Sequence, residues 1–405
     1  MFLHFVSLLS AMAAQAGPAA CPIEDAASEK PGWRAECDAA IKAERDPVAQ
    51  AVLLFRSAYA YNEASQYFEA RDALERAVKL DPANPVAWHE LSYTANALGD
   101  YDEGERAADT ELTLRGDFVA TYQERAFSRL YLAKLDGLYA DRDKVVTMLP
   151  TEAAPLLDRA AAAMWLGRFD RARSDLDSAT KLAKGDAGLG KSIAAFHESL
   201  VLWTTTSPKG AAGCAWPRDN AALHVPGFIG DCTAAFLAAK SPTRRAEFLT
   251  YRSLAWLSAK QDSATATLDR AVAAAIDPGS ADAHANLGFA YLDAHHSWAA
   301  AREFDRAIAI KVSWAALAGR SAAKYNREDP EGALADAKRS FEIEPNELAL
   351  TVLGDLAHDR GDDKSAKLYW IGAYHLGSTG DAMRDRLKGI GVEHPEREPR
   401  EGPKP

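Results

Sequence analysis

The sequence predicts an all-α protein in which antiparallel helix pairs are stacked one after another. The first observation is a set of small and aliphatic residues at helical spacing, Ala70, Leu74 and Ala77, which recurs along the chain. The second is the step of this set, a period of about 34 residues, which separates Ala70 from Gly104 and, doubled, Gly104 from Ala172. The third is a pair of residues that end helices, a glycine between the two helices of a pair and a proline after the second helix. A generic helical bundle does not explain a fixed step, whereas a repeat protein does.

The composition fits a well-buried globular protein and excludes several other classes. Of the 405 residues, 48% are hydrophobic and 26% are charged, and 58 Asp and Glu against 47 Lys and Arg give a net charge of −11. The absence of a basic block excludes a nucleic-acid-binding groove, because phosphate contacts need clustered Lys and Arg. After the N-terminus, no apolar run reaches the ~18 residues of a membrane-spanning helix. We therefore expect no nucleic-acid partner and no transmembrane segment in the mature chain.

The first sixteen residues have the pattern of a secretory signal peptide. Residues 2–12 form a short apolar core, and a small-residue cleavage pattern, Ala-Gln-Ala, follows at 14–16. No Lys or Arg precedes the core, so a buried N-terminal helix is the alternative. Cys21 has a weak likeness to a lipidated cysteine, but Pro18 stands where that pattern requires Leu. We expect an exported chain, periplasmic or secreted, without a lipid anchor.

The four cysteines indicate disulfides in an exported chain, where an even number usually pairs. Three pairings are possible, and we predict the neighbouring ones, Cys21–Cys37 and Cys214–Cys232. Each closes a short loop, which stabilises by roughly 3 kcal/mol in the chain-entropy model. A zinc site at Cys214, His224 and Cys232 is the alternative, but it lacks a Cys-x-x-Cys pair and a second nearby His. We expect two disulfides and no metal.

Further sets of spaced residues continue the repeat toward the C-terminus. They are Ala172/Leu176/Ala179, Ala264/Leu268/Ala271, Ala300/Phe304/Ala307, Ala333/Ala337/Ser340 and Ala366/Trp370/Ala373. The last three steps are each close to one period, but Ala172 and Ala264 are separated by two periods and an inserted segment. Leu-Gly at 98–99 and 166–167 marks turns between helices, since Gly tolerates positive φ. Asp-Pro at 81–82 ends a second helix, because Pro cannot continue one.

This pattern resembles the tetratricopeptide repeat, a unit of about 34 residues with spaced Trp, Leu-Gly, Tyr, Ala, Phe or Leu, Ala and Pro. A well-matched copy reads Leu287-Gly288, Tyr291, Ala300, Phe304 and Ala307. The resemblance implies a right-handed superhelical solenoid of about nine repeats over residues 51–379. Two repeats are degenerate, one around Leu138 and one at 187–242.

Four segments lie outside the regular repeats. Residues 17–50 are expected to form an N-terminal capping segment. Residues 204–230 are rich in Gly, Pro, Thr and Trp and are expected to form an extended loop between helices, closed by the second disulfide. A cap helix is expected at 380–392, because terminal repeats need a polar outer face. The proline-rich segment 393–405 is expected to be a disordered tail.

No arrangement of residues predicts catalysis or a cofactor. Gly185 with Gly-Lys-Ser at 190–192 matches the phosphate-binding loop of nucleotide hydrolases. That loop must follow a strand, whereas this one follows the helix-type segment 170–184, so we interpret it as a turn between repeats. His89-Glu90 lacks the second His of a zinc protease. We therefore predict a non-enzymatic protein.

The family resemblance implies a protein-binding function. Members bind extended peptides or partner helices on a concave face that is lined by the first helix of each repeat. We therefore expect a protein–protein interaction scaffold of the cell envelope, with an unidentified protein or peptide as partner. Two alternatives remain, a redox or catalytic function of the 204–230 loop and a purely structural spacer.

Aligning the first helices on the repeat period gives candidate groove residues. They are Tyr59, Asn62, His89, Tyr93, Asn96, Phe127 and Phe289. The aromatic side chains offer broad apolar contact, and the amides can bond both N–H and C=O of an extended chain. These positions carry no Lys or Arg, so a charged chain end is not the expected ligand. The alternative is that the aromatics pack between repeats, or that residues 21–46 fill the groove.

Overall fold

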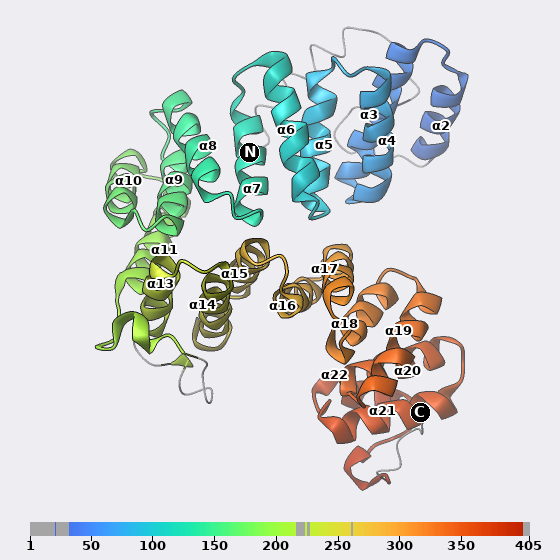
Figure 1. The fold of residues 1–405 in the computed structure, drawn as a ribbon. Helices are drawn as coiled ribbons and strands as arrows, with labels where there is room; N and C mark the ends of the chain where they lie inside the picture. The colour runs from blue at the N-terminus through green and yellow to red at the C-terminus, as the bar shows by residue number, and fades with distance from the viewer. Residues whose placement is uncertain (1–20, 22–31, 216–222, 225–226, 261, 400–405) are drawn as a thin grey trace. The chain divides into compact units, whose positions relative to one another are not determined.

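The computed structural model describes residue 21 and residues 32–215, 223–224, 227–260 and 262–399 (Figure 1). None of these residues lies in a β-strand. The chain divides into two compact units, unit 1 (residues 1–200) and unit 2 (residues 201–405). The predicted signal peptide, 1–16, lies outside the described residues. No described helix is both long enough and apolar enough to cross a membrane.

Unit 1 is a row of helical hairpins preceded by a single helix. Its helices are α2 (Trp33–Ala43), α3 (Pro47–Glu63), α4 (Tyr67–Leu80), α5 (Pro85–Ala97), α6 (Tyr101–Arg115), α7 (Val119–Tyr131), α8 (Leu135–Met148), α9 (Ala154–Trp165) and α10 (Phe169–Leu182). Each packs against the next, and the first helices of neighbouring hairpins also touch, as α5 touches α7. The helix α11 (Ala187–Thr204) crosses from unit 1 into unit 2.

Unit 2 repeats the same arrangement. It contains η2 (Gly210–Gly213), α13 (Phe228–Ala238), α14 (Pro242–Ala255), a π-helix η3 (Trp256–Lys260), α15 (Ser263–Ile276), α16 (Ala281–Asp293), α17 (Ser297–Ile310), α18 (Trp314–Tyr325), α19 (Pro330–Ile343), α20 (Glu347–Asp359), α21 (Asp363–Leu376), α22 (Asp381–Gly389) and η4 (Pro395–Arg397). From α13 to α22, each helix again packs against the next. The predicted all-α solenoid of antiparallel helix pairs is confirmed.

The helices begin and turn where the sequence predicts. Asp46 and Asn84 accept hydrogen bonds from backbone N–H groups at the starts of α3 and α5, and a proline follows each. The turn within seven hairpins has one residue in the left-handed region, namely Ser65, Gly99, Ala133, Gly167, His295, Glu328 and Gly361. Four of these are not glycine, and each such residue costs about 1–2 kcal/mol. The shared turn geometry is therefore maintained by helix packing where glycine is missing.

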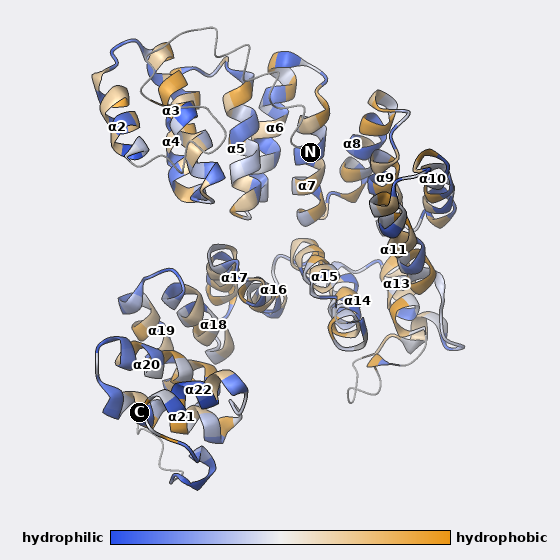
Figure 2. Ribbon diagram, turned by 180° about the vertical axis from the view of Figure 1, so that it is seen from behind, coloured by the Kyte–Doolittle hydropathy of each residue, from blue (hydrophilic) through white to orange (hydrophobic). Residues whose placement is uncertain are grey.

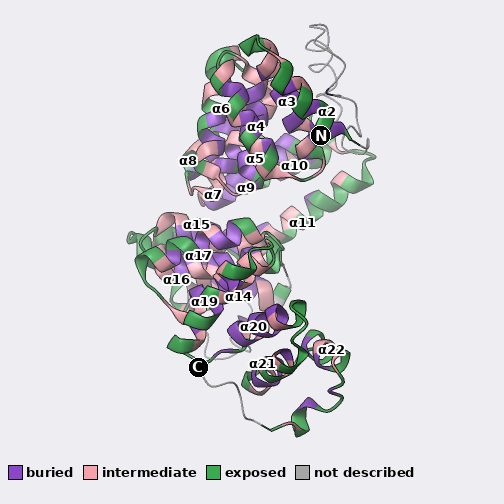
Figure 3. Cartoon of the chain, turned by 90° about the vertical axis from the view of Figure 1, so that its right-hand side faces the viewer, coloured by how far each residue is buried: buried purple, intermediate pink, exposed green. Residues whose placement is uncertain are grey.

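Small residues lie where the two helices of a hairpin cross, as predicted. Ala70, Ala172, Ala300 and Ala366 are fully buried. Figure 3 shows that buried residues lie mainly along the faces where helices meet, and Figure 2 shows that most helices carry both apolar and polar residues. This is the pattern expected when stacking buries one face of each helix.

One register predicted from sequence is wrong. In α15, Ala264 is exposed, whereas Ala266 and Ala273 are buried and occupy the helix crossing. The corrected step, from Ala266 to Ala300, equals the step from Ala70 to Gly104. The error arose because the alanine-rich segment offers two sets of small residues. The π-helix η3 adds one residue to this hairpin between its two helices.

The N-terminal disulfide joins Cys21 to Cys37 of α2, with Cα atoms 4.8 Å apart. α2 packs on α3, and Trp33 of α2 makes an edge contact with Tyr61 of α3 at 4.8 Å between ring centroids. The predicted pairing of these cysteines is confirmed. The helix therefore covers the apolar face of the first hairpin, which is what a capping segment does.

The C-terminal end is more ordered than predicted. α22 lies within the expected cap segment and buries Met383 and Leu387. Residues 393–399 are not the expected disordered tail, because Pro395 is buried and the Glu398 backbone oxygen lies 3.1 Å from Nε2 of His375. Charged residues and prolines favoured disorder in the sequence, but contacts with α21 order the segment. Residues 400–405 lie outside the described part of the chain.

Candidate functional site

Five aromatic side chains of unit 1 make contacts that recur with the repeat, and we call them the aromatic ladder. They are Tyr67, Tyr93, Tyr101, Phe127 and Tyr131. The Tyr67 and Tyr93 rings meet edge to face with centroids 6.4 Å apart, and Tyr101 and Phe127 do the same at 6.1 Å. Both partners of the second pair lie one period after those of the first. The contact therefore recurs with the repeat. It links the second helix of one hairpin to the first helix of the next hairpin.

Two rings of the aromatic ladder are exposed. Tyr93 is 41% exposed and Phe127 is 38% exposed, although both are large apolar side chains. Tyr131 supports Phe127 from the same helix at 4.9 Å and stacks on Tyr101 at 4.4 Å. The two exposed rings are thus held in place by half-buried neighbours. Such rigid, exposed aromatics favour contact with another molecule.

Asn62 was predicted to bond a bound peptide, but the structure uses it internally. Its Nδ2 donates to Oγ1 of Thr94 at 2.9 Å and to Oε2 of Glu90 at 3.1 Å. Thr94 in turn donates to Oδ1 of Asn62. The side chain is buried, and both partners lie on the first helix of the next hairpin. Asn62 therefore joins two repeats and has little remaining capacity for a ligand.

The side chain of Asn96 is used internally in the same way. Nδ2 of Asn96 donates to the backbone oxygen of Glu124 at 3.1 Å and to its Oε2 at 3.0 Å. Ser128 donates to Oδ1 of Asn96 at 2.7 Å. The partners of Asn96 lie one period after those of Asn62, so the whole set of bonds is periodic. Sequence spacing could have indicated it, since Asn, Glu and Thr or Ser recur together.

His89 is also buried and does not line a surface. Its Nδ1 lies 2.9 Å from Oε2 of Glu111, and Glu111 also bonds Arg115. Burial opposes protonation of His89, but the hydrogen bond and the charge of Glu111 outweigh it and raise the pKa of the ring. His89 lies one turn before Tyr93 on α5, but its side chain points toward neighbouring helices and not toward the exposed surface.

The last two predicted groove residues are less exposed than Tyr93 and Phe127. Tyr59 is half-buried on α3. Phe289 lies in unit 2, where its ring meets the buried Phe304 at 5.0 Å between centroids. Phe289 therefore takes part in the packing of its own hairpin. Of the predicted groove residues, Tyr93 and Phe127 are the ones left exposed.

Comparisons with known proteins give fold-level likeness alone. No family model and no curated protein matches the sequence. The chain is similar to the crystal structure of a tetratricopeptide repeat protein from Parabacteroides merdae, with 14% identity over 84% of this chain and 98% of that one and a TM-score of 0.30. It is also similar to the APC/C hetero-tetramer Cut9–Hcn1, with 14% identity over 85% of this chain and 83% of that one and a TM-score of 0.35. For yeast Tom70, the identity is 14% over 85% of this chain and 95% of that one, and the TM-score is 0.29. Because these TM-scores are low, the description of the repeats rests on the chain's own sequence and structure.

Those repeats have the fixed step, the small residues at the helix crossing, the shared turn and the consecutive packing of helices. The helix pairs of this chain thus resemble those of the tetratricopeptide repeat. The chain departs from the tetratricopeptide pattern at one position of the first helix, which that pattern fills with the Leu of Leu-Gly. Leu91 and Leu287 keep the apolar residue, but four other first helices have arginine at this position.

Each of these arginines is paired with an aspartate on the second helix of its own repeat. In the best-buried examples, Nε and one Nη nitrogen bond the two carboxylate oxygens side by side, at 2.7–2.9 Å. The pairs are Arg125–Asp141, Arg159–Asp175, Arg252–Asp269 and Arg320–Asp336. We call them the arginine clamps. The sequence alone does not reveal them, because Arg and Asp at helical spacing usually lie on an exposed face.

The second disulfide bears on the redox and metal alternatives. Cys214 and Cys232 are bonded, with Cα atoms 4.7 Å apart, which confirms the predicted pairing. They are 6% and 0% exposed, so a thiol reagent has little access to either sulfur. No cluster of potential metal ligands occurs among the described residues. The expected loop at 204–230 includes η2, and Asp231 fixes its start by accepting hydrogen bonds from Ser207.

The apparent phosphate-binding loop has the wrong context. Gly190, Lys191 and Ser192 lie inside α11 and are exposed. The preceding element is the helix α10, not a strand. Backbone N–H groups inside a helix are already bonded, so they cannot wrap a phosphate. The motif is a coincidence of the turn between repeats.

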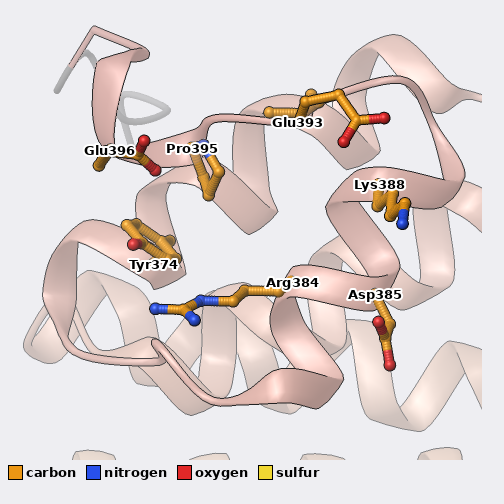
Figure 4. Close-up of a pocket in the computed structure, with 8 residues that line it drawn as sticks. Tyr374, Arg384, Asp385, Lys388, Glu393, Pro395 and Glu396 are labelled. Carbon is orange, nitrogen blue, oxygen red and sulfur yellow. The ribbon is translucent and has the colours of Figure 1, made fainter.

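A hollow of about 450 Å³ lies beside α22 in unit 2 (Figure 4). It is lined by Tyr374, Arg384, Asp385, Lys388, Val392, Glu393, Pro395 and Glu396. In Figure 4, the guanidinium of Arg384 extends toward Tyr374, whereas Asp385 points away from it. Two cations and three carboxylates share this open surface. This mixture selects no particular charge or shape, and we assign it no site.

Proposed function

We propose that this chain is a tetratricopeptide-repeat protein and a non-enzymatic scaffold of the cell envelope, and that the aromatic ladder of unit 1 binds an extended peptide or a helix of a partner protein. The observation that carries the proposal is the exposure of Tyr93 and Phe127 at the same position of consecutive repeats. Large aromatic side chains supply much of the binding energy at protein interfaces.

The rings, and not the asparagines, would make the contact. Asn62 and Asn96 are occupied by bonds between repeats. Burial, the hydroxyl of Tyr67 and nearby carboxylates raise the pKa of Tyr93 to about 12. Tyr93 therefore keeps its proton at the pH of any cell compartment, and it presents an apolar ring with a neutral hydroxyl.

The envelope location is supported by the cysteines. Both disulfides belong to buried parts of the fold, and such bonds form and persist in oxidising compartments. The signal-peptide pattern at residues 1–16 points the same way. A redox function of the 204–230 loop finds little support, because the sulfurs of Cys214 and Cys232 are buried. A pure spacer would not need exposed rings at matched positions.

The test is affinity capture from an envelope extract with the wild-type protein and with Tyr93→Ala, followed by mass spectrometry and titration of the captured partner. We expect Tyr93→Ala to weaken binding by about 2 kcal/mol, or roughly 30-fold, the scale of an interface hot spot. The melting temperature should change little, because 41% of the side chain is exposed to solvent.

Leu114→Ala is the matched control. Leu114 is also 41% exposed, but it lies at the far end of α6 from the ladder residue Tyr101. More than three turns of helix separate them, or about 20 Å. The control should bind as wild type. A partner that binds both variants and wild type equally, or a large loss of stability in Tyr93→Ala with unchanged affinity, would refute the proposal.

A further inference from the structure

A column of carboxylates accompanies the exposed rings. Glu90 lies three residues before Tyr93 on α5, and Glu124 lies three residues before Phe127 on α7. Asp158 occupies the next equivalent position, on α9, where Arg142 pairs with it. Residues three apart share a helix face. The same repeat position therefore places negative charge beside each exposed ring.

In the part of the chain that the structure describes, the two carboxylates beside the rings are not paired with lysine or arginine. Glu90 and Glu124 accept hydrogen bonds from the neutral amides of Asn62 and Asn96, and among the described residues neither forms an ion pair with Lys or Arg. Burial raises the pKa of Glu90, against the charge of His89 and the amide of Asn62. A cation bound beside Glu90 would favour the ionised form of its carboxyl group and would be attracted to it strongly, because the local dielectric constant is low.

The two exposed rings lie at equivalent positions of neighbouring first helices. They lie on α5 and α7, which pack against each other, and packed helices have axes about 8–10 Å apart. Tyr93 contacts Tyr67, whereas Phe127 contacts Tyr101 and Tyr131. A group midway between the two rings would lie within the ~6 Å of each centroid over which a cation is attracted to an aromatic face.

We infer that the space between Tyr93 and Phe127 takes a lysine or arginine side chain of the partner, held by the two rings and by the charges of Glu90 and Glu124. The occupant is thus a basic segment of a partner protein. This inference rests on the proposed function and names the chemistry of its ligand. An acidic segment or a free carboxylate terminus would be repelled at the same place.

The direct test compares two peptides on the unmodified protein by isothermal titration calorimetry at physiological salt. One is an N-acetylated tetra-arginine amide, and the other replaces every arginine with citrulline, which has nearly the same shape without the charge. We expect the arginine peptide to bind at least tenfold more tightly. Equal binding of the two peptides, or tighter binding of a tetraglutamate amide, overturns the inference.

A variant pair then locates the binding. Glu90→Gln/Glu124→Gln keeps the oxygen acceptors for Asn62 and Asn96 but removes two negative charges. Asp72→Asn/Asp170→Asn removes two charges from side chains that are 73% and 103% exposed elsewhere on unit 1. We expect at least a fivefold loss of arginine-peptide affinity in the first and less than twofold in the second. Equal losses would show general attraction to an acidic chain and would overturn the inference.

The outcomes also separate this inference from the proposed function. If the captured partner depends on Tyr93 but the arginine and citrulline peptides bind alike, the proposed function stands and the basic ligand does not. If neither partner nor peptide depends on Tyr93 or Phe127, both fail. The comparison of peptides on the wild-type protein remains decisive even where a variant folds poorly.

Discussion

Arg159 holds Asp175 through two parallel hydrogen bonds, Nε to Oδ2 at 2.9 Å and Nη2 to Oδ1 at 2.8 Å. Both side chains are buried, and the remaining nitrogen, Nη1, bonds Oδ1 of Asp143 on the second helix of the preceding repeat. The arginine therefore ties two consecutive repeats together. In the second repeat, Leu91 and Ala107 occupy the equivalent positions and achieve the same packing without charge.

We predict that Arg159→Leu destabilises unit 1 by about 3 kcal/mol, because it removes both parallel hydrogen bonds of the buried Asp175. The exposed Arg171, 3.3 Å from Oδ1 of Asp175, compensates only a small part of this loss. Arg159→Leu/Asp175→Ala should recover most of this loss, since it copies the apolar pair Leu91 and Ala107. Urea unfolding followed by circular dichroism measures both free energies. A double variant as unstable as the single one would show that the clamp is needed for more than charge balance.

A second prediction concerns the pH dependence of stability. The pKa of His89 is raised in the folded protein, because the hydrogen bond and charge of Glu111 outweigh the effect of burial. The folded state thus holds this proton more tightly than the unfolded state. The stabilisation is complete below the ordinary value of about 6.5 and is lost as pH rises through the folded pKa.

Thermal unfolding between pH 5 and pH 9 tests this, with His89→Gln as the comparison because it cannot titrate there. The wild-type protein should lose stability with rising pH faster than His89→Gln above about pH 6.5. Parallel curves for the two proteins would contradict the assigned role of the His89–Glu111 pair.

The sequence was sufficient for the features that each repeat carries within itself. The small residues at the helix crossing, the turns at Gly99 and Gly167 and both disulfides depend on local spacing and on short loops. The register of α15 failed because Ala264 and Ala266 are equally small. Only packing, together with the residue added by the π-helix, distinguishes them.

Features that join one repeat to the next were not predicted. Asn62 and Asn96 were assigned to a ligand because their partners on the next hairpin lie 28 and 32 residues away. The arginine clamps were missed because a charge pattern alone does not show that Arg159 and Asp175 face inward. In both cases the sequence holds a second copy one period further on, and comparison of polar positions between repeats would have found it.

The third prediction is that the Cys214–Cys232 bond is structural. In the native protein it should resist excess reduced glutathione at neutral pH, because both sulfurs are buried. Cys214→Ser/Cys232→Ser should lower the free energy of unfolding by roughly 3 kcal/mol, as expected for a short closed loop. Alkylation with mass spectrometry counts the thiols. Rapid reduction of the folded protein would instead favour the redox alternative.

The fourth prediction is that Lys191→Ala changes neither fold nor partner binding. Lys191 is exposed inside α11, and exposed substitutions of this kind usually change stability by less than about 0.5 kcal/mol. Calorimetry should detect no ATP binding by either protein. Micromolar ATP affinity that disappears in Lys191→Ala would show that the phosphate-loop interpretation had been dismissed wrongly.

The last prediction concerns the close packing of α18 against the ring of Phe304 on α17. Phe304 of α17 is fully buried, and a Cβ added to Gly319 of α18 would lie 2.2 Å from its Cζ. Gly319→Ala should therefore cost about 1–3 kcal/mol as overpacking, even though alanine is the better helix former by about 1 kcal/mol.

Two further variants make this prediction specific. Gly319→Ala/Phe304→Leu should recover part of the loss, because leucine lacks the outer ring atoms and occurs at the equivalent positions 74 and 176. Gly190→Ala, within α11, is the control, since nothing lies within 4 Å of its added Cβ. Because the added methyl group meets no neighbour, Gly190→Ala should gain stability from the higher helix propensity of alanine. If Gly319→Ala also gained stability, the ring would have to move freely, and close packing of α17 against α18 would not explain why this position is glycine.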